Sequence, residues 1–333
     1  MCIVMDEFER PFGGKNIILA GDFAQLPPAS HAPSLYSHRV TTTLHKTNSV
    51  NQQEATMGKF IWHMFTTVVI LRQNMRQRLQ SKMDAKFRTL LENLRYKSCT
   101  PEDCALLDSR ITGATSDGSS IADPEFRNVS IIVSFNWQRD AINELKVKSF
   151  ARDTNQELHT FYSIDSYPSS KRSNEDQLSR KLRKNLSNPV RANNNMDYRM
   201  QQVLWELAPE NTRNLPSKLQ ICIGMPVMVR YKIATECGVT NGAEGIVVGW
   251  KSIPLYEDKS ALETLFVKLT SLPTTIQIEG LPDNVVPIPA EKYTIQCKMP
   301  NEQSKTISRQ QVYVIPNFAM TDFSSQGRTR PFN

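Results

Sequence analysis

The 333-residue sequence has no C-x-x-C pair, and its six cysteines stand away from any histidine cluster. Structural zinc sites and disulfide frameworks need paired or closely spaced cysteines, so we expect no structural zinc, no disulfides and a reducing compartment. No apolar run approaches the roughly 18 residues of a membrane-spanning helix. Acidic residues stand as early as position 6, which argues against a secretory signal peptide. The sequence therefore predicts an intracellular protein without a membrane partner.

A phosphate loop is also missing, because no G-x-x-x-x-G-K-[ST] string occurs. The nearest string, Gly13-Gly14-Lys15-Asn16, precedes an apolar run typical of a strand, whereas a phosphate loop must precede a helix.

Composition sets broad limits on what is present. Hydrophobic residues make up 39% and charged residues 22% of the chain, as in ordinary globular proteins. The length allows two domains, or one domain with an insertion. The formal charge of +7 favours a polyanionic partner, although many basic proteins bind no nucleic acid.

Two apolar runs near the N-terminus end in acidic or amide side chains. Cys2–Met5 leads into Asp6 and Glu7, and Asn16–Ala20 leads into Asp22 and Gln25. Such runs predict buried parallel strands, whose carboxyl ends meet along one edge of a sheet where open α/β folds bind ligands. Carboxylates there hold magnesium or activate water in nucleotide hydrolases. The alternative is that these are solvated acids following two ordinary strands.

These strings resemble motifs II and III of the Pif-type DNA helicases of superfamily one, in the form carried by Helitron transposons. The matching residues are Asp6-Glu7 and Gly21-Asp22-Phe23-Ala24-Gln25-Leu26-Pro27-Pro28. The resemblance implies that Asp6 coordinates Mg²⁺, Glu7 activates water, Gln25 senses the γ-phosphate of ATP, and Asp22 supports the nucleotide site. It also implies single-stranded DNA as partner and a nuclear location, with work in DNA repair, recombination and telomere maintenance.

A third string follows the β-branched run Thr66–Leu71, which predicts a strand. Asn74-Met75-Arg76-Gln77 resembles motif IV of the same helicases. The resemblance implies that Arg76 contacts the γ-phosphate of ATP. A guanidinium suits that role because it is permanently charged and bidentate toward phosphate. The alternative is a surface basic patch that includes Arg72.

Helices are expected on both sides of this string. Met57, Phe60, Ile61, Met64 and Phe65 form a stripe at helical spacing, most simply explained as core. Phe87–Leu94 gives a second stripe, and Thr100 with Pro101 opens a third helix.

The run Val129–Val133 predicts a buried strand, and Ala141, Ile142 and Leu145 mark the helix after it. This strand–turn–helix resembles the start of the family's second RecA-like domain. In the turn, Trp137 is either a base-stacking residue or, as we expect, a packed one.

Residues 168–197 are basic and nearly free of apolar side chains, which indicates a mobile segment. A DNA-phosphate contact and a solvated linker are equally favoured for it. Short strands with an Asn241-Gly242 turn then predict a small β-barrel over about 237–300. The strings there resemble the accessory barrel inserted in the family's second domain.

The string Phe318–Thr329 resembles motif V, with Phe323-Ser324 where the family more often has His-Lys. The resemblance implies that four residues contact the backbone of single-stranded DNA and that two residues line the nucleotide cleft. The backbone residues are Thr321, Ser325, Arg328 and Thr329, and the cleft residues are Gln326 and Gly327.

Together these features predict an α/β fold: RecA-like parallel-sheet helicase domains, the first incomplete, with a small inserted β-barrel. Residues 1–72 are expected to form the C-terminal part of the first RecA-like domain and residues 73–333 the second. The predicted function is ATP-dependent, 5′-to-3′ translocation on single-stranded DNA. Because the phosphate loop and the last arginine motif are missing, we expect a chain truncated at both ends and inactive alone. A non-catalytic DNA-binding module and a transposon remnant are the alternatives.

Overall fold

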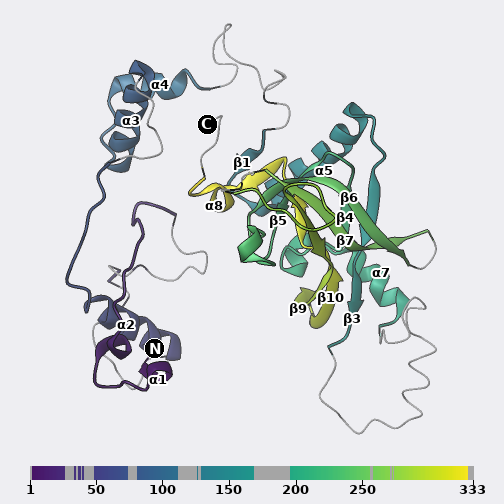
Figure 1. The fold of residues 1–333 in the computed structure, drawn as a ribbon, viewed down its shortest axis with the longest axis horizontal. Helices are drawn as coiled ribbons and strands as arrows, with labels where there is room; N and C mark the ends of the chain where they lie inside the picture. The colour runs from purple at the N-terminus through teal and green to yellow at the C-terminus, as the bar shows by residue number, and fades with distance from the viewer. Residues whose placement is uncertain are drawn as a thin grey trace. The chain divides into compact units, whose positions relative to one another are not determined.

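The computed structural model describes residues 2–26, 34, 37–38, 40, 49–73, 81–111, 126, 129–168, 196–255, 258–270, 272 and 274–328. The chain divides into two compact units (Figure 1). The first unit comprises residues 1–120, 326–331 and 333, and the second comprises residues 121–325 and 332. Each unit is described by itself.

The first unit is helical in its described part. Its elements are α1 (Cys2–Met5), the 3₁₀ turn η1 (Pro11–Gly14), α2 (Val50–Trp62), α3 (Lys82–Arg95) and α4 (Pro101–Asp108). Ser49 and Thr100 each form a capping box, which satisfies backbone N–H groups that a helix leaves free at its start. The predicted helix opening at Thr100 is therefore confirmed.

Three predicted strands of this unit are wrong. Cys2–Met5 is a helix, and neither Ile17–Ala20 nor Thr66–Leu71 pairs as a strand in the described structure. The side chains of Ile18 and Leu71 are 91% and 90% exposed. A short apolar run suits a helix as well as a strand, and a strand forms only where a neighbour takes up its backbone hydrogen bonds. Of the predicted stripe, Met57, Phe60 and Ile61 lie in α2, but Met64 and Phe65 follow its end. Phe60 is 67% exposed rather than core.

The second unit contains the predicted strand–turn–helix. Strand β1 (Ile131–Val133) leads through a short turn into α5 (Asn136–Asp153). Strand β12 (Ala319–Thr321) pairs with β1 in parallel, with Val133 opposite Thr321, and continues into α8 (Asp322–Ser325). The strand β1 is less buried than expected, since Ile132 is 46% exposed.

A larger, barrel-like sheet carries most of the core of this unit. Its strands are ordered β11 (Val314–Pro316), β5 (Pro226–Val229), β6 (Glu244–Pro254), β7 (Ser260–Leu269), β2 (His159–Tyr162) and β4 (Lys218–Ile221), and β8 (Val285–Pro289) pairs with β7. Gly242, at φ +89°, makes the turn before β6, as the Asn-Gly pair predicts. Val227, Val247, Leu265 and Ile288 are fully buried within it. The fold class, α/β with a parallel pair and a barrel-like sheet, is confirmed.

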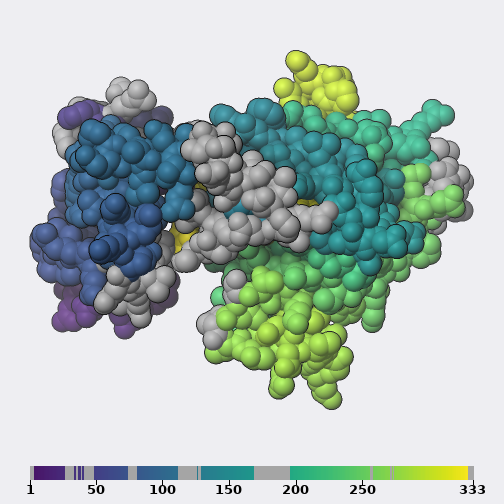
Figure 2. Space-filling model, turned by 90° about the horizontal axis from the view of Figure 1, so that it is seen from above, coloured from purple at the N-terminus to yellow at the C-terminus, as the bar shows by residue number. Residues whose placement is uncertain are grey.

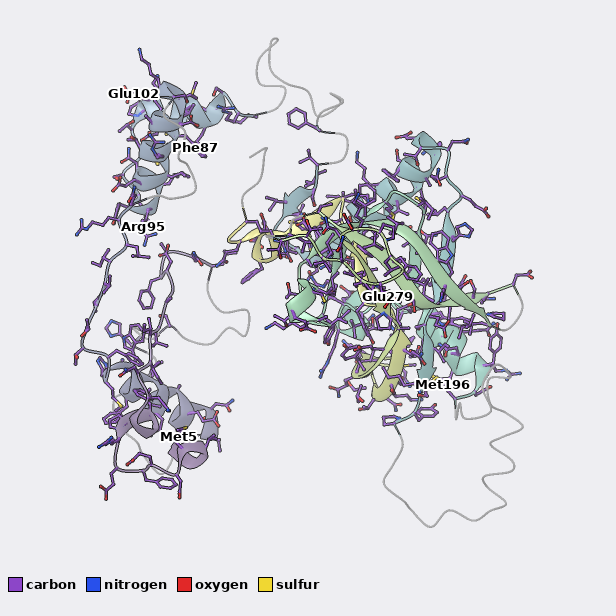
Figure 3. The ribbon with its side chains drawn as sticks, in the orientation of Figure 1. Met5, Phe87, Arg95, Glu102, Met196 and Glu279 are labelled. Atoms are coloured by element: carbon purple, nitrogen blue, oxygen red, sulfur yellow. The ribbon has the colours of Figure 1, made fainter. Side chains whose placement is uncertain are left out.

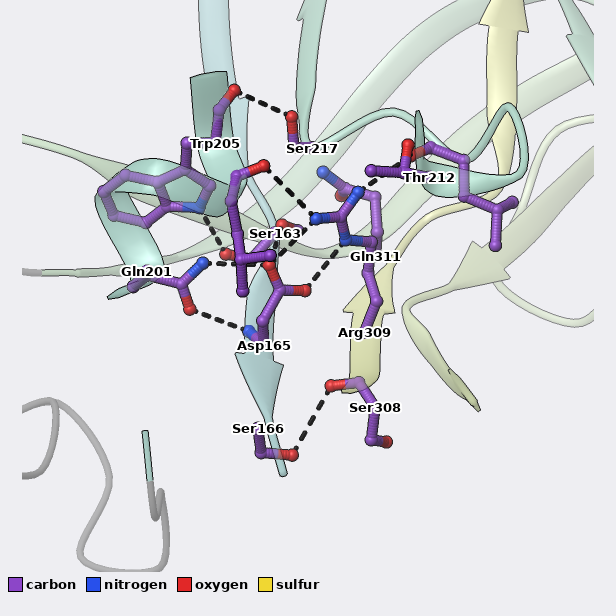
Figure 4. Close-up of polar contacts among 12 residues, drawn as sticks. Ser163, Asp165, Ser166, Gln201, Trp205, Thr212, Ser217, Ser308, Arg309 and Gln311 are labelled. Atoms are coloured by element: carbon purple, nitrogen blue, oxygen red, sulfur yellow. Dashed lines mark hydrogen bonds and ion pairs between the residues drawn. The ribbon is translucent and has the colours of Figure 1, made fainter. Parts of the chain in front are cut away.

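A third sheet orders β3 (Ile164–Ser166), β10 (Ser304–Gln311) and β9 (Glu291–Lys298). The helix α7 (Tyr198–Glu206) and the 3₁₀ turn η3 (Pro209–Thr212) lie beside it, and η4 (Thr235–Cys237) follows β5. A fully buried ion pair ties these elements together (Figure 4). Arg309 donates from Nε and Nη2 to Asp165 at 2.8 and 3.0 Å, and Gln201 donates to the same carboxylate at 3.0 Å.

Candidate nucleotide and nucleic-acid site

The first predicted pair, Asp6 and Glu7, follows a helix instead of a strand. Asp6 is exposed and adopts a left-handed backbone conformation with φ at +50°, and Glu7 is half-buried. Within the described ranges no group of three or more His, Cys, Asp or Glu side chains is arranged to hold a metal ion. The prediction that Asp6 and Glu7 lie at the end of a strand is therefore wrong.

The Gly21–Leu26 string folds into a turn around Asp22. The amide of Ala24 donates to Asp22 Oδ1 at 2.9 Å, and the amide of Gln25 donates to the Asp22 carbonyl at 3.2 Å. Arg95, at the C-terminal end of α3 (Figure 3), donates to both carboxylate oxygens of Asp22 at 2.7 and 2.8 Å. The Arg95 hydrogen bond, and then that of Ala24, lower the pKa of Asp22 to about 2. The Asp22 carboxylate is therefore ionised and already engaged by a cation.

Gln25 and Gln326 are brought together, although 301 positions separate them. The Gln326 side chain donates to Gln25 Oε1 at 2.7 Å, and both residues fall in the first unit. Gly327 follows at φ +81°, a conformation that glycine adopts without strain. Within the first unit, Gln326 of the motif V-like string thus contacts Gln25 of the motif III-like string through an amide–amide hydrogen bond.

The motif V-like residues Thr321 and Ser325 lie at the carboxyl end of β12 and in α8. Thr321 is buried, and its Oγ1 lies 3.1 Å from Ser324 Oγ and accepts from the Ser324 amide at 3.4 Å. Ser324, which stands where the family more often has lysine, is thus used to order the turn into α8. Ser325 and Arg328 are half-buried. Arg76 and Thr329 lie outside the described residues, as does most of the predicted basic segment 168–197.

Sequence reasoning missed the residue that holds β12 in place. Asn143, buried in α5, accepts from the amides of Phe318 and Ala319 at 3.1 and 2.9 Å, and donates to the Ala319 carbonyl at 3.3 Å. The buried face of α5 runs through Arg139, Asn143, Val147 and Ala151, whereas the predicted marker Leu145 is 71% exposed. The four-residue spacing of these positions was the signal for a buried helix face. Because Arg139 and Asn143 are polar, the face did not stand out as an apolar stripe.

Trp137, one residue into α5, is 64% exposed, so the packed state expected for it is wrong. Figure 2 shows the teal residues around α5 on the surface of the second unit. An exposed indole beside the start of a helix is available to stack on a flat ligand.

The arrangement does not fit Mg²⁺ and ATP by itself. Asp6 lies on an exposed turn, the Asp22 carboxylate is bound by Arg95, and the sequence has no phosphate-loop string to hold the β- and γ-phosphates. What the described residues do provide is a polar strand end, at Thr321 and Ser325, and an exposed aromatic side chain, Trp137, in the helix that follows the paired strand β1.

In the described structure no helix is long and apolar enough to cross a membrane. Cys99, Cys104, Cys222, Cys237 and Cys297, the cysteines whose side chains the structure describes, are free thiols.

Comparisons with known proteins agree on one family. The family model for the PIF1-like helicase matches residues 1–103. The ATP-dependent DNA helicase PIF1 of Mus musculus is 26% identical over 248 residues, covering 73% of this chain and 27% of the mouse protein. The chain therefore spans about a quarter of the length of that relative.

Among solved structures, Bacteroides Pif1 bound to single-stranded DNA covers 99% of this chain at 16% identity, with a TM-score of 0.51. The chain corresponds to 57% of that protein, and the likeness establishes the fold. Pif1 helicase from Candida albicans covers 98% of the chain, and 59% of its own length is matched, at 18% identity with a TM-score of 0.49.

Proposed function

Taking the chain as a Pif1-type helicase of superfamily one, we propose that it supplies the single-strand-binding part of an ATP-dependent DNA helicase of the Pif/Helitron type. In this proposal Thr321, Ser325, Arg328 and Thr329 contact the DNA backbone, and translocation runs 5′ to 3′ as the resemblance implies. A nuclear location and work in DNA repair, recombination and telomere maintenance belong to the same proposal, as does the Helitron relationship.

One observation carries the proposal. The Thr321–Ser325 segment begins where the parallel strand β12 ends, opposite the end of β1, and the carboxyl ends of parallel strands are where open α/β folds bind ligands. The exposed indole of Trp137 starts α5 after that same end of β1. Backbone contacts combined with a stacking surface are typical of proteins that bind single strands without sequence preference.

The ATP-dependent roles of Asp6, Glu7, Gln25, Arg76, Gln326 and Gly327 are proposed only for a site completed by a phosphate loop. Without that loop we expect the 333-residue chain to bind DNA but not to turn over ATP. DNA binding without ATP turnover would distinguish a DNA-binding module from a complete enzyme.

The test titrates labelled single-stranded DNA with the full chain at several salt concentrations. We expect micromolar or tighter binding whose logarithm falls steeply and linearly with the logarithm of salt concentration, because neutralised phosphates release counterions. No binding at low salt would end the proposal.

A parallel ATPase assay with Mg²⁺ and single-stranded DNA tests the catalytic half. We expect no turnover above buffer. Turnover that Glu7→Gln abolishes would show that the argument from the missing phosphate loop is wrong.

A further inference from the structure

Arg230 carries a charge that no described residue of the second unit neutralises by direct contact. It follows β5 directly, and its backbone amide donates to the Tyr313 carbonyl at 2.9 Å. Its side chain is half-buried, and its guanidinium makes neither an ion pair nor a side-chain hydrogen bond within the described residues. A half-buried charge without a partner is costly unless a ligand supplies one.

The direction of this side chain follows from the strand. Residues two positions apart share a face of a strand, so Arg230 extends the face used by Met228. Met228 packs against Ile315 and Met320, and Met320 belongs to β12. Arg230 is thereby aimed toward β12 and the helix that covers it.

The helix that covers β12 presents a second arginine to the same region. Asn143 of α5 hydrogen-bonds β12, and Arg139 lies one turn earlier on the same buried face with 2% exposure. Burial, and then the charge of Arg139, lower the pKa of Arg230, while Asp140 acts in the opposite direction. The charges of Arg139 and Asp140 therefore both act on the Arg230 guanidinium.

The charges in this cluster do not balance. Arg139 donates to Asp140 Oδ1 from Nε at 2.8 Å and from Nη2 at 2.7 Å, and to Asn136 Oδ1 at 2.7 Å. Asp140 thus forms its ion pair with Arg139, and the Arg230 guanidinium has no carboxylate partner among the described residues. One carboxylate against two guanidinium groups leaves a net charge of one, suited to an anion.

We propose that the Arg230 guanidinium binds a phosphate group, with the charge of the buried Arg139 adding to the attraction, and that this group is a backbone phosphodiester of single-stranded DNA. The choice of DNA rests on the proposed function, because Trp137 and Thr321 border the same strand ends, at the start of α5 and opposite Val133.

The main experiment compares Arg230→Gln with Arg152→Gln in the full chain, using labelled single-stranded oligothymidylate. Arg152 is exposed in the last turn of the same helix α5, so its replacement removes the same charge away from the cluster. We expect Arg230→Gln to weaken binding roughly tenfold and to reduce the salt slope by about one, as loss of one phosphate contact does. Arg152→Gln should bind like the parent chain. Equal affinities and slopes for all three proteins would overturn the proposal.

Thermal unfolding without DNA separates binding from a structural role. Removing an unpaired, half-buried charge should leave the melting temperature of Arg230→Gln unchanged or higher. A lower melting temperature would mean that Arg230 is a structural residue, and would overturn the proposal even if binding fell.

Inorganic phosphate distinguishes a failure of this site from a failure of the proposed function. If the parent chain does not bind DNA, stabilisation by phosphate over chloride at equal ionic strength still supports an anion site, provided that Arg230→Gln abolishes it. In that case free phosphate rather than DNA is the ligand. No stabilisation, or equal stabilisation of both proteins, together with no DNA binding, overturns the phosphate site itself.

Discussion

The two units differ in where they place their apolar side chains. In the second unit the barrel-like sheet closes over fully buried residues such as Val227, Val267 and Ile288. In the described part of the first unit, Val40 and Leu90 are the buried hydrophobic side chains, while Ile18 and Leu71 stand about nine-tenths exposed. The apolar runs of the first unit are as apolar as the strands of the second unit. The difference teaches that an apolar run becomes a buried strand only where a neighbouring strand and a second layer are present to cover it.

The same contrast holds for ion pairs. Asp165–Arg309 in the second unit has 0% exposure on both side chains, whereas Asp22–Arg95 in the first unit has 30% and 45%. Both are bidentate. Buried charges depend on each other because water cannot replace a lost partner, while exposed charges are resolvated. Substitutions in the two units test this difference.

Asp165→Ala should have the largest effect, because it leaves the Arg309 guanidinium buried without its counter-charge. We expect a loss of about 3–5 kcal/mol in the free energy of unfolding. Urea unfolding followed by tryptophan fluorescence measures it, since the Trp205 indole donates to the Ser163 carbonyl at 2.8 Å within this network. The double variant Asp165→Leu with Arg309→Met should lose much less. A single variant no more destabilised than the double would refute the dependence of one charge on the other.

Asn143→Leu should come next, because it leaves the amides of Phe318 and Ala319 without their acceptor. A buried donor left unsatisfied costs about 1–3 kcal/mol, so destabilisation of at least that size is expected in urea unfolding. The exposed neighbour Glu144, which pairs with Lys148 on the surface of α5, is the control, and Glu144→Gln should be nearly neutral. If the two variants behaved alike, Asn143 would not be the residue that holds β12.

Local sequence signals predicted much of this structure. The helix start at Thr100 and the Asn241-Gly242 turn are set by neighbours within a few positions, and both formed as predicted. Strands β6, β7 and β9 likewise appear where β-branched and aromatic residues gather. Such features need no distant partner to be recognised.

Long-range contacts were not predictable in the same way. Asp165 and Arg309 are 144 positions apart, and the polar sequence of β10 gives no sign of a buried arginine. Gln25 and Gln326 were singled out separately by the resemblance, but nothing in either string indicated their mutual hydrogen bond. For the first unit, the apolar runs predicted strands that the described structure does not form. A strand requires a neighbouring strand for its backbone hydrogen bonds, and the local sequence does not show whether one is present.

Arg95→Gln should have a smaller effect on stability and a clear effect on titration. The pKa of Asp22, now about 2, should rise toward its ordinary value of about 3.9. Because the folded pKa is depressed, the pair stabilises the fold above the unfolded-state pKa, and this contribution disappears as pH falls toward 2. Carboxyl NMR titration measures the shift. An unchanged Asp22 pKa would mean that the Ala24 amide, and not Arg95, sets it.

Ile70→Ser should have the smallest effect, and it tests the comparison most directly. Ile70 is 69% exposed in the extended Thr66–Leu71 run, so its loss should change the free energy of unfolding by no more than about 0.5 kcal/mol. The matched change Val267→Ser, in the fully buried centre of β7, removes a packed side chain and introduces a hydroxyl, so it should cost several-fold more. Urea unfolding of both variants measures the ratio. Equal losses would mean that Ile70 is covered in solution, and that the first unit buries its apolar runs as the second does.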